Sequence, residues 1–191
     1  MLETITIGKS KIRQALLALY FSNAGNKYYL RQLERLLRYS AGNIRRELLR
    51  LRGAQLLKTE RIGNLLYYSL NQNHPLFEEL KSIVSKTIGV EASLRALLSS
   101  ARNIKVAFIF GSVAIKSEKE TSDVDVFIIG KPEWSLLNEK IRGLELRLKR
   151  EINLAVYSWK EYQAKKKAKS GFILNLLKNP KIMLVGSEDD L

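Results

Sequence analysis

A short apolar run that ends at a Gly-Ser pair constrains the fold of this chain more than any other feature. The run covers residues 106–110, and its β-branched and aromatic side chains favour a buried strand over a helix. Gly111 allows the backbone to turn tightly, and Ser112 can begin a helix whose free N–H groups favour a phosphate. These residues therefore predict a strand, a tight turn and a phosphate-binding helix start.

A second strand is expected over residues 122–129, where two acids alternate with apolar residues. Alternation along a strand places Asp123 and Asp125 on one face and directs Val124 and Val126 into the core. An Asp-x-Asp pair alone usually marks a solvated strand end. Beside a phosphate-binding turn, however, two carboxylates on a rigid strand are suited to hold Mg²⁺, or Mn²⁺, together with a nucleoside triphosphate (NTP).

The two motifs together resemble the signature of the DNA polymerase beta-like nucleotidyltransferase superfamily in its minimal form. The motifs are Phe110-Gly111-Ser112 and Ser122-Asp123-Val124-Asp125-Val126, and the resemblance spans about residues 86–187. It implies a small mixed sheet with helices on one side, two metal ions, and transfer of a nucleoside monophosphate (NMP) from an NTP. By this resemblance, Gly111 and Ser112 bind nucleotide, and Asp123 and Asp125 are catalytic metal ligands.

The resemblance also implies a third carboxylate on a later strand, and this chain departs from that pattern. The matching strand is expected over residues 150–157, where Asn153 takes the place of the acid. An Asn can offer a carbonyl oxygen to a metal, but it cannot take up the proton of an attacking hydroxyl. Glu151 lies on the same face of that strand. Either Glu151 substitutes for the missing acid, or it pairs at the surface with Lys149 or Arg150.

A second departure follows the Gly-Ser pair. Relatives often carry Ala-Arg-Gly there, whereas this chain has Ala114-Ile115-Lys116. Lys116 is a candidate contact for a phosphate of the nucleotide. The alternative is that residues 116–121 form a solvated loop.

Positive charge is concentrated in the front half of the chain. The formal net charge of the protein is +14, and residues 1–86 hold 15 Lys and Arg against 6 Asp and Glu. A basic domain attracts polyanions through counterion release, and nucleic acid is the commonest such partner. A high isoelectric point is also a trait of whole proteomes, so charge alone does not identify nucleic acid as the partner, and the pattern of predicted elements is needed as well.

That pattern predicts three helices followed by a hairpin. The helices are expected over residues 10–21, 29–37 and 43–52, and the strands over residues 56–61 and 65–70. Ser10 is the predicted N-cap of the first helix, Gly53 is expected just beyond the third, and Gly63-Asn64 forms the hairpin turn. Three helices and a hairpin in this order predict a winged helix-turn-helix.

This half resembles the winged-helix regulators of the ArsR/MarR-like type over about residues 9–72. The resemblance implies that the third helix enters the major groove of double-stranded DNA, that the hairpin contacts the backbone, and that the protein forms a homodimer. The candidate DNA-binding residues are Asn43, Arg45, Arg46, Arg50, Arg61 and Asn64. Arg46 and Arg50 share a helix face, and no acid between them is expected to neutralise them, which favours a phosphate-binding surface. The alternative is a solvated face on a module that contacts other proteins.

The expected architecture is α/β, of the α+β type, with three segments. They are a winged helix-turn-helix at residues 1–74, a helical connector at 75–100, and a nucleotidyltransferase-like domain of mixed β-sheet and helices at 101–191. The chain has no Cys, no signal peptide and no apolar run long enough to span a bilayer. These features predict a cytoplasmic protein that has no membrane partner.

Three functions are compatible with these patterns. The preferred hypothesis is a DNA-binding transcriptional regulator whose nucleotidyltransferase-like domain binds Mg²⁺ and an NTP with weak or no turnover. The alternative is an active nucleotidyltransferase that moves an NMP to a hydroxyl of a protein, an RNA or a small molecule. A third hypothesis treats both halves as protein-binding scaffolds, but two neighbouring carboxylates repel unless a cation or protons offset them, which argues against it.

Overall fold

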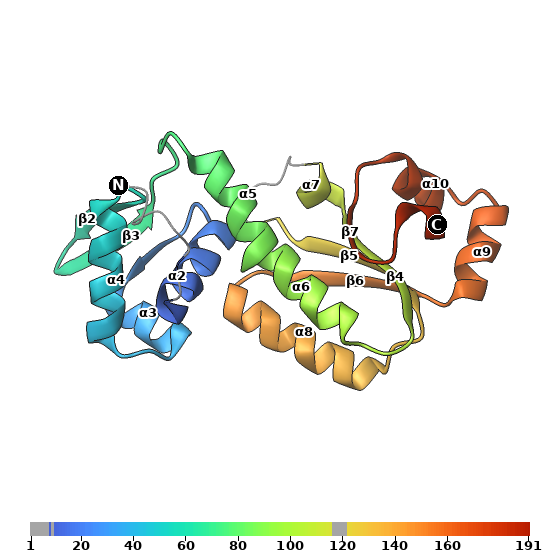
Figure 1. Ribbon diagram of the computed structural model, residues 1–191, viewed down its shortest axis with the longest axis horizontal. Coiled ribbons are helices and arrows are strands. Elements are labelled where there is room, and N and C mark those ends of the chain that lie inside the picture. Colours follow the sequence, from blue (N-terminus) through green and yellow to red (C-terminus); the bar gives the residue numbers. More distant parts are fainter. Residues whose placement is uncertain (1–7, 9, 116–121) are drawn as a thin grey trace. The chain divides into compact units, whose positions relative to one another are not determined.

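The computed structural model describes residues 8, 10–115 and 122–191 (Figure 1). The chain divides into two compact units. The first contains residues Met1–Val90 with Arg147–Lys149, and the second contains residues Glu91–Leu146 with Arg150–Leu191. Each unit has a hydrophobic core of its own.

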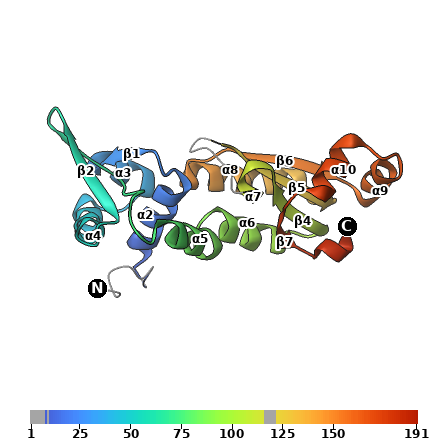
Figure 2. The same cartoon turned by 90° about the horizontal axis from the view of Figure 1, so that it is seen from above.

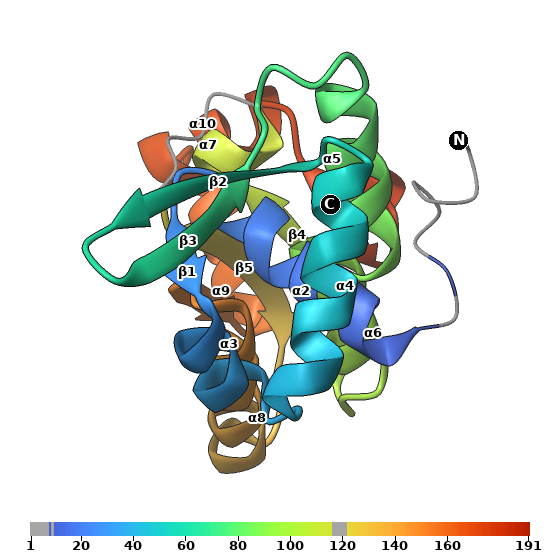
Figure 3. The same ribbon diagram turned by 90° about the vertical axis from the view of Figure 1, so that its left-hand side faces the viewer.

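The part of the first unit that the structure describes is built from four helices and a small antiparallel sheet (Figure 3). In chain order the elements are α2 (Lys11–Ser22), β1 (Lys27–Tyr29), α3 (Leu30–Leu37), α4 (Ala41–Gly53), β2 (Leu57–Ile62), β3 (Leu65–Leu70) and α5 (Phe77–Thr87). The strand order is β1-β3-β2, and both pairings are antiparallel. The three helices and the hairpin expected from the sequence are therefore present, and β1 is a strand that the sequence did not predict.

The helix ends of this unit follow the capping chemistry of the sequence, with one exception. The Ser10 side chain accepts a hydrogen bond from the Arg13 backbone N–H at 3.3 Å, which confirms the predicted N-cap of α2. The prediction that Gly53 lies beyond α4 is wrong, because Gly53 is the last residue of that helix. Gln55 takes the left-handed conformation instead, with φ at 59°.

The hairpin extends beyond the core of the first unit. Gly63 has φ at 57°, a left-handed conformation that glycine adopts without steric cost, and it forms the predicted turn together with Asn64. Residues 58–66 are all exposed, whereas Tyr68 and Leu70 farther along β3 are buried. Both faces of the hairpin end are therefore exposed to solvent.

The second unit is a mixed sheet with helices. Its elements are α6 (Val90–Ser99), β4 (Ile104–Phe110), α7 (Gly111–Ala114), β5 (Val124–Gly130), α8 (Trp134–Leu148), β6 (Ile152–Tyr157), α9 (Trp159–Lys167), α10 (Gly171–Lys178), β7 (Ile182–Val185) and the 3₁₀ turn η1 (Glu188–Asp190). The strand order is β6-β5-β4-β7. β5 and β6 run parallel, and the other two pairings are antiparallel.

Helices cover both faces of this sheet. On one face Phe108 and Phe127 pack against Tyr162 of α9 and Ile173 of α10, two helices that lie side by side (Figures 1 and 2). The residues of β5 that point to the other face are also completely buried. Helices α6 and α8 lie over this second face (Figure 1), and they carry buried residues that are not part of the first cluster, among them Leu94, Leu98, Leu137, Ile141 and Leu144. The expectation of helices on one side only is therefore wrong.

Among the residues that the structure describes, no helix combines the length and the apolar character that crossing a bilayer requires.

Candidate functional site

The two acids of the Asp-x-Asp motif lie on the same face of the second sheet. Asp125 belongs to β5, and Asp123 is the residue just before this strand. Val124 and Val126 are completely buried on the opposite face, whereas both aspartates are partly exposed. The alternation of the strand therefore places two carboxylates next to each other at the edge of solvent.

Gly111 brings a backbone bend directly against one of these carboxylates. Phe110, the last residue of β4, is the cross-strand partner of Asp125, so Gly111 follows the strand at this point. A Cβ atom built on Gly111 would lie 2.7 Å from Oδ2 of Asp125, and the φ of Gly111 is 71°. Both the close approach and the left-handed backbone require glycine. Segments 14 residues apart in the sequence thus meet at one place.

Asn153 completes the cluster from the neighbouring strand. It is the register partner of Asp125 in the parallel pair β5–β6. Its Nδ2 donates to Oδ2 of Asp123 at 3.2 Å and to Oδ1 of Asp125 at 3.3 Å. The amide therefore bridges the two carboxylates and offsets part of the repulsion between their charges.

The helix expected at Ser112 begins one residue earlier, at Gly111. Ser112 is the second residue of α7, a helix of only four residues, and it is partly exposed. A single turn has a smaller dipole than a full helix. Lys116, the third candidate contact for the nucleotide, lies outside the residues that the structure describes.

The side chains at this place suit one hard cation. Within residues 10–115 and 122–191, no group of three or more His, Cys, Asp or Glu side chains could hold a metal ion. The available donors are two carboxylates and the carbonyl oxygen of an Asn amide. These are oxygen ligands of the kind that Mg²⁺ accepts, and Mg²⁺ usually takes its remaining ligands from water and substrate phosphates. The donor set therefore fits a divalent cation that binds together with a nucleotide.

Two further residues near the cluster were not identified from the sequence. Arg150 donates from Nε to the Ser122 carbonyl oxygen at 2.8 Å, and this bond ties the start of β6 to the residue before Asp123. Phe172 of α10 lies with its ring centroid 6.1 Å from that of Phe110. Arg150 stood out in the sequence only as a surface partner of Glu151. Phe172 carried no signal, because α10 is far from the motif along the chain.

Glu151, the residue that could replace the missing acid, is exposed just before β6. Its backbone carbonyl oxygen accepts a hydrogen bond from the Val124 N–H at 2.9 Å, which extends the pairing of β5 and β6 by one residue.

The candidate DNA-binding residues all lie on exposed parts of the first unit. Ile44, Leu48 and Leu51 form the buried stripe of α4, as the sequence predicted. The opposite side of α4 carries exposed side chains, and the hairpin carries two more. The exposed candidates are Asn43, Arg45, Arg46 and Arg50 on α4, and Arg61 and Asn64 at the end of the hairpin.

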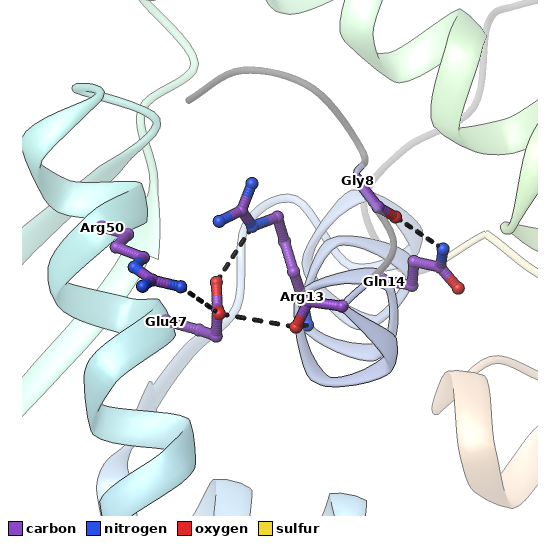
Figure 4. A network of polar contacts seen from close by, with 6 residues as sticks. Gly8, Arg13, Gln14, Glu47 and Arg50 are labelled. Carbon is purple, nitrogen blue, oxygen red and sulfur yellow. Dashed lines mark hydrogen bonds and ion pairs between the residues drawn. The ribbon is translucent and has the colours of Figure 1, made fainter. Parts of the chain in front are cut away.

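A buried acid changes the charge of this helix (Figure 4). Glu47 of α4 is only 6% exposed. Its Oε2 accepts from Arg13 Nε at 2.9 Å, and its Oε1 accepts from Arg50 Nη1 at 2.9 Å. The expectation that no acid neutralises the arginines is therefore wrong for Arg50. Burial raises the pKa of Glu47, but the hydrogen bond and charge of Arg13, together with those of Arg50, outweigh it and leave the pKa lowered.

Comparison with known proteins gives a family match for the second half of the chain. The model of the family Polymerase beta, Nucleotidyltransferase matches residues 92–187, which is half of the chain and includes the whole Asp123, Asp125 and Asn153 cluster. No curated protein matches the sequence.

Two solved structures show limited similarity. The crystal structure of a toxin-antitoxin with AMP-PNP is 17% identical, and the match covers 52% of this chain and 76% of that one with a TM-score of 0.37. A protein assigned as a nucleotidyltransferase from Sulfolobus solfataricus is also 17% identical. That match covers 49% of this chain and 73% of the other, with a TM-score of 0.27.

Proposed function

We propose that Asp123 and Asp125 bind a divalent cation together with the phosphates of an NTP beside Gly111. The basis is that this chain belongs to the Polymerase beta nucleotidyltransferase family. The bridging amide of Asn153 is the observation that carries the proposal. Its NH₂ group lies between the two carboxylates, where a cation would be held, and a half-turn of the amide would present its carbonyl oxygen to that cation instead. The three residues come from two adjacent strands whose register is fixed by the sheet.

The same amide argues for slow turnover. A transfer to a hydroxyl requires a group that takes up the proton of that hydroxyl, and an amide cannot do so. If the acid has the role in this reaction that the resemblance implies, its replacement lowers the rate by about two to four decades. We therefore propose binding of Mg²⁺ and NTP with weak or no transfer.

Each side chain has a distinct part in this binding. Asp123 and Asp125 supply two negative charges, which balance one Mg²⁺ ion, so we propose one tightly held cation rather than the two that the resemblance implies. When bound, this cation would neutralise and orient the phosphate oxygens. Gly111 lets the backbone bend tightly against the Asp125 carboxylate, and Asn153 holds the two carboxylates in place.

The test is a comparison of wild type with Asn153→Asp. Because the substitution restores a carboxylate, it should produce transfer of labelled NMP from an NTP to acceptors in a cell lysate at a rate at least about 100-fold above wild type. Thermal unfolding should show stabilisation by Mg²⁺ with ATP in wild type and no stabilisation in Asp123→Asn/Asp125→Asn. If Mg²⁺ and ATP stabilised both proteins equally, the proposed cation site would be wrong.

Rapid transfer by wild type would instead favour the second candidate function, an active nucleotidyltransferase that acts on a hydroxyl of a protein, an RNA or a small molecule. In that case Glu151→Gln decides which group takes up the proton. Loss of transfer in Glu151→Gln would identify Glu151 as the acid that replaces the one missing at Asn153.

We also propose that the first unit is a winged helix-turn-helix that binds double-stranded DNA as part of a transcriptional regulator. Support comes from the order of α2, α3, α4 and the hairpin, and from the arginines on the exposed side of α4. A salt-titrated mobility shift on duplex DNA is the direct test. If no fragment is shifted at low salt, the exposed face is better explained as a contact surface for protein.

A further inference from the structure

An exposed aromatic ring lies close to the acid cluster without belonging to it. Phe172 is the second residue of α10 and is 45% exposed, although its ring lies beside the hydrophobic core of the second unit. Its ring centroid lies 6.1 Å from that of Phe110 and 6.2 Å from that of Phe127. Phe110 directly precedes Gly111, and Phe127 lies two residues after Asp125.

The register of the sheet fixes this position. Phe110 is the cross-strand partner of Asp125 and directly precedes Gly111. Phe127 follows Asp125 by two residues and therefore lies on the same face of β5. Phe172 therefore covers Phe110, which lies opposite Asp125, and Phe127, which is the next residue of β5 on the same face. This is the face from which a ligand would reach the two carboxylates.

The packing of α10 holds this ring in place and leaves it accessible. Ile173 and Leu176 are buried against the sheet and anchor the helix. The Phe172 ring meets Phe110 edge-on, with an interplanar angle of 78°, and it is tilted by 45° against Phe127. Neither contact is a parallel stack, so the exposed ring can receive a flat partner.

We propose that Phe172 is the stacking platform for the nucleobase of the NTP held at Asp123 and Asp125; this inference rests on the proposed function of that site. In such a ligand the ribose separates the base from the phosphates. With the phosphates at Asp123 and Asp125, a ring that packs on Phe127, two residues farther along β5, is suitably placed for the base. Stacking on an aromatic ring accepts any base, since every base has a π-face, and the larger purines gain the most contact area. The ligand class is therefore an NTP, with purines preferred.

Binding of two probes separates the base from the phosphates. Calorimetry with Mg²⁺-ATP and with Mg²⁺-tripolyphosphate gives the dissociation constant of each probe for wild type and variants. In Phe172→Leu, which keeps an apolar side chain over Phe127, the constant for ATP should rise by about ten-fold, and the constant for tripolyphosphate should stay unchanged. Phe172→Trp should restore tight binding of ATP.

A matched control is available on the same helix. Leu174 is 38% exposed, and Leu174→Ala should leave both constants unchanged. Equal binding of ATP by wild type and Phe172→Leu would overturn the stacking role and leave the cation site standing. Parallel weakening of both probes would show that Phe172 only supports the fold. Failure of wild type to bind either probe would overturn both the proposed function and this inference.

Discussion

Two independent constraints act on Gly111, and they make it the residue whose substitution is easiest to interpret. Its φ of 71° is costly for any residue with a Cβ atom, and that atom would lie 2.7 Å from the Asp125 carboxylate. Gly111→Ala should therefore lower the free energy of unfolding by about 1–2 kcal/mol. It should also reduce the stabilisation by Mg²⁺ and ATP. Urea titration with and without these ligands measures both effects.

A second glycine provides the control. Gly143 lies in α8 with no atom within 4 Å of an added Cβ. Gly143→Ala should raise the free energy of unfolding by about 1 kcal/mol, because alanine is the better helix former. If the two substitutions had the same effect, the close approach of Gly111 to Asp125 would not matter for stability.

Sequence reasoning at the level of single residues succeeded where a pattern fixes geometry. The alternation of β5 places Asp123 and Asp125 on one face, and the family motif identifies Asn153 as their neighbour. The pairing of Glu47 with Arg50 could have been inferred from their i,i+3 spacing. Its pairing with Arg13 could not, because residues 34 positions apart meet only through the packing of α2 on α4.

At the scale of elements, the ion pairs of Glu47 connect α2 with α4. The folded-state pKa of Glu47 is lowered, so its ionised form stabilises the fold. That stabilisation is complete above the ordinary value of 4.5 and disappears as the pH falls below it, through the lowered pKa. Glu47→Gln should cost about 3 kcal/mol at pH 7, since Arg13, which is largely buried, and Arg50 both lose the carboxylate that they contact.

The measurement is the free energy of unfolding of wild type and Glu47→Gln between pH 7 and pH 3. The difference between the two proteins should be largest at neutral pH and should shrink in acid. A difference that stays constant over this range would mean that the charge of Glu47 contributes nothing and only its shape matters.

The elements themselves were predictable to different degrees. Long amphipathic helices such as α2 and α4 follow from the spacing of apolar residues, and the hairpin follows from Gly63-Asn64. The strand β1 has three residues and exists because β3 offers it a partner, which no local pattern reveals. The length of α7, a single turn, was not predictable either, because a Gly-Ser pair indicates where a helix begins but not how long it continues.

At the scale of the whole molecule, charge is distributed unevenly between the two halves. Residues 1–86 account for +9 of the total of +14. This surplus supports the proposed binding of DNA, which should weaken steeply with salt because each neutralised phosphate releases counterions. The sequence revealed the excess of positive charge, but it did not show which arginines are free to act.

The ion pair within α4 leads to a quantitative prediction for DNA binding. Arg46→Ala should reduce the slope of log K against log salt by about one, as expected for one lost phosphate contact. Arg50→Ala should change the slope less, because the ion pair with Glu47 already neutralises part of the charge of Arg50. Salt-titrated mobility shifts measure both slopes, and Arg142→Ala, at an exposed position of α8, serves as the control. A larger effect at Arg50 than at Arg46 would contradict the structural assignment.

The amide of Asn153 has a consequence for the evolution of this site. Rotation of an amide by half a turn exchanges a donor for an acceptor, so the same side chain can contact the two carboxylates or a positive ion bound between them. The codons of Asn and Asp differ by a single base. A lineage that carries this chain is therefore one point mutation from regaining an acid at a position where the surrounding strands already hold the geometry for it.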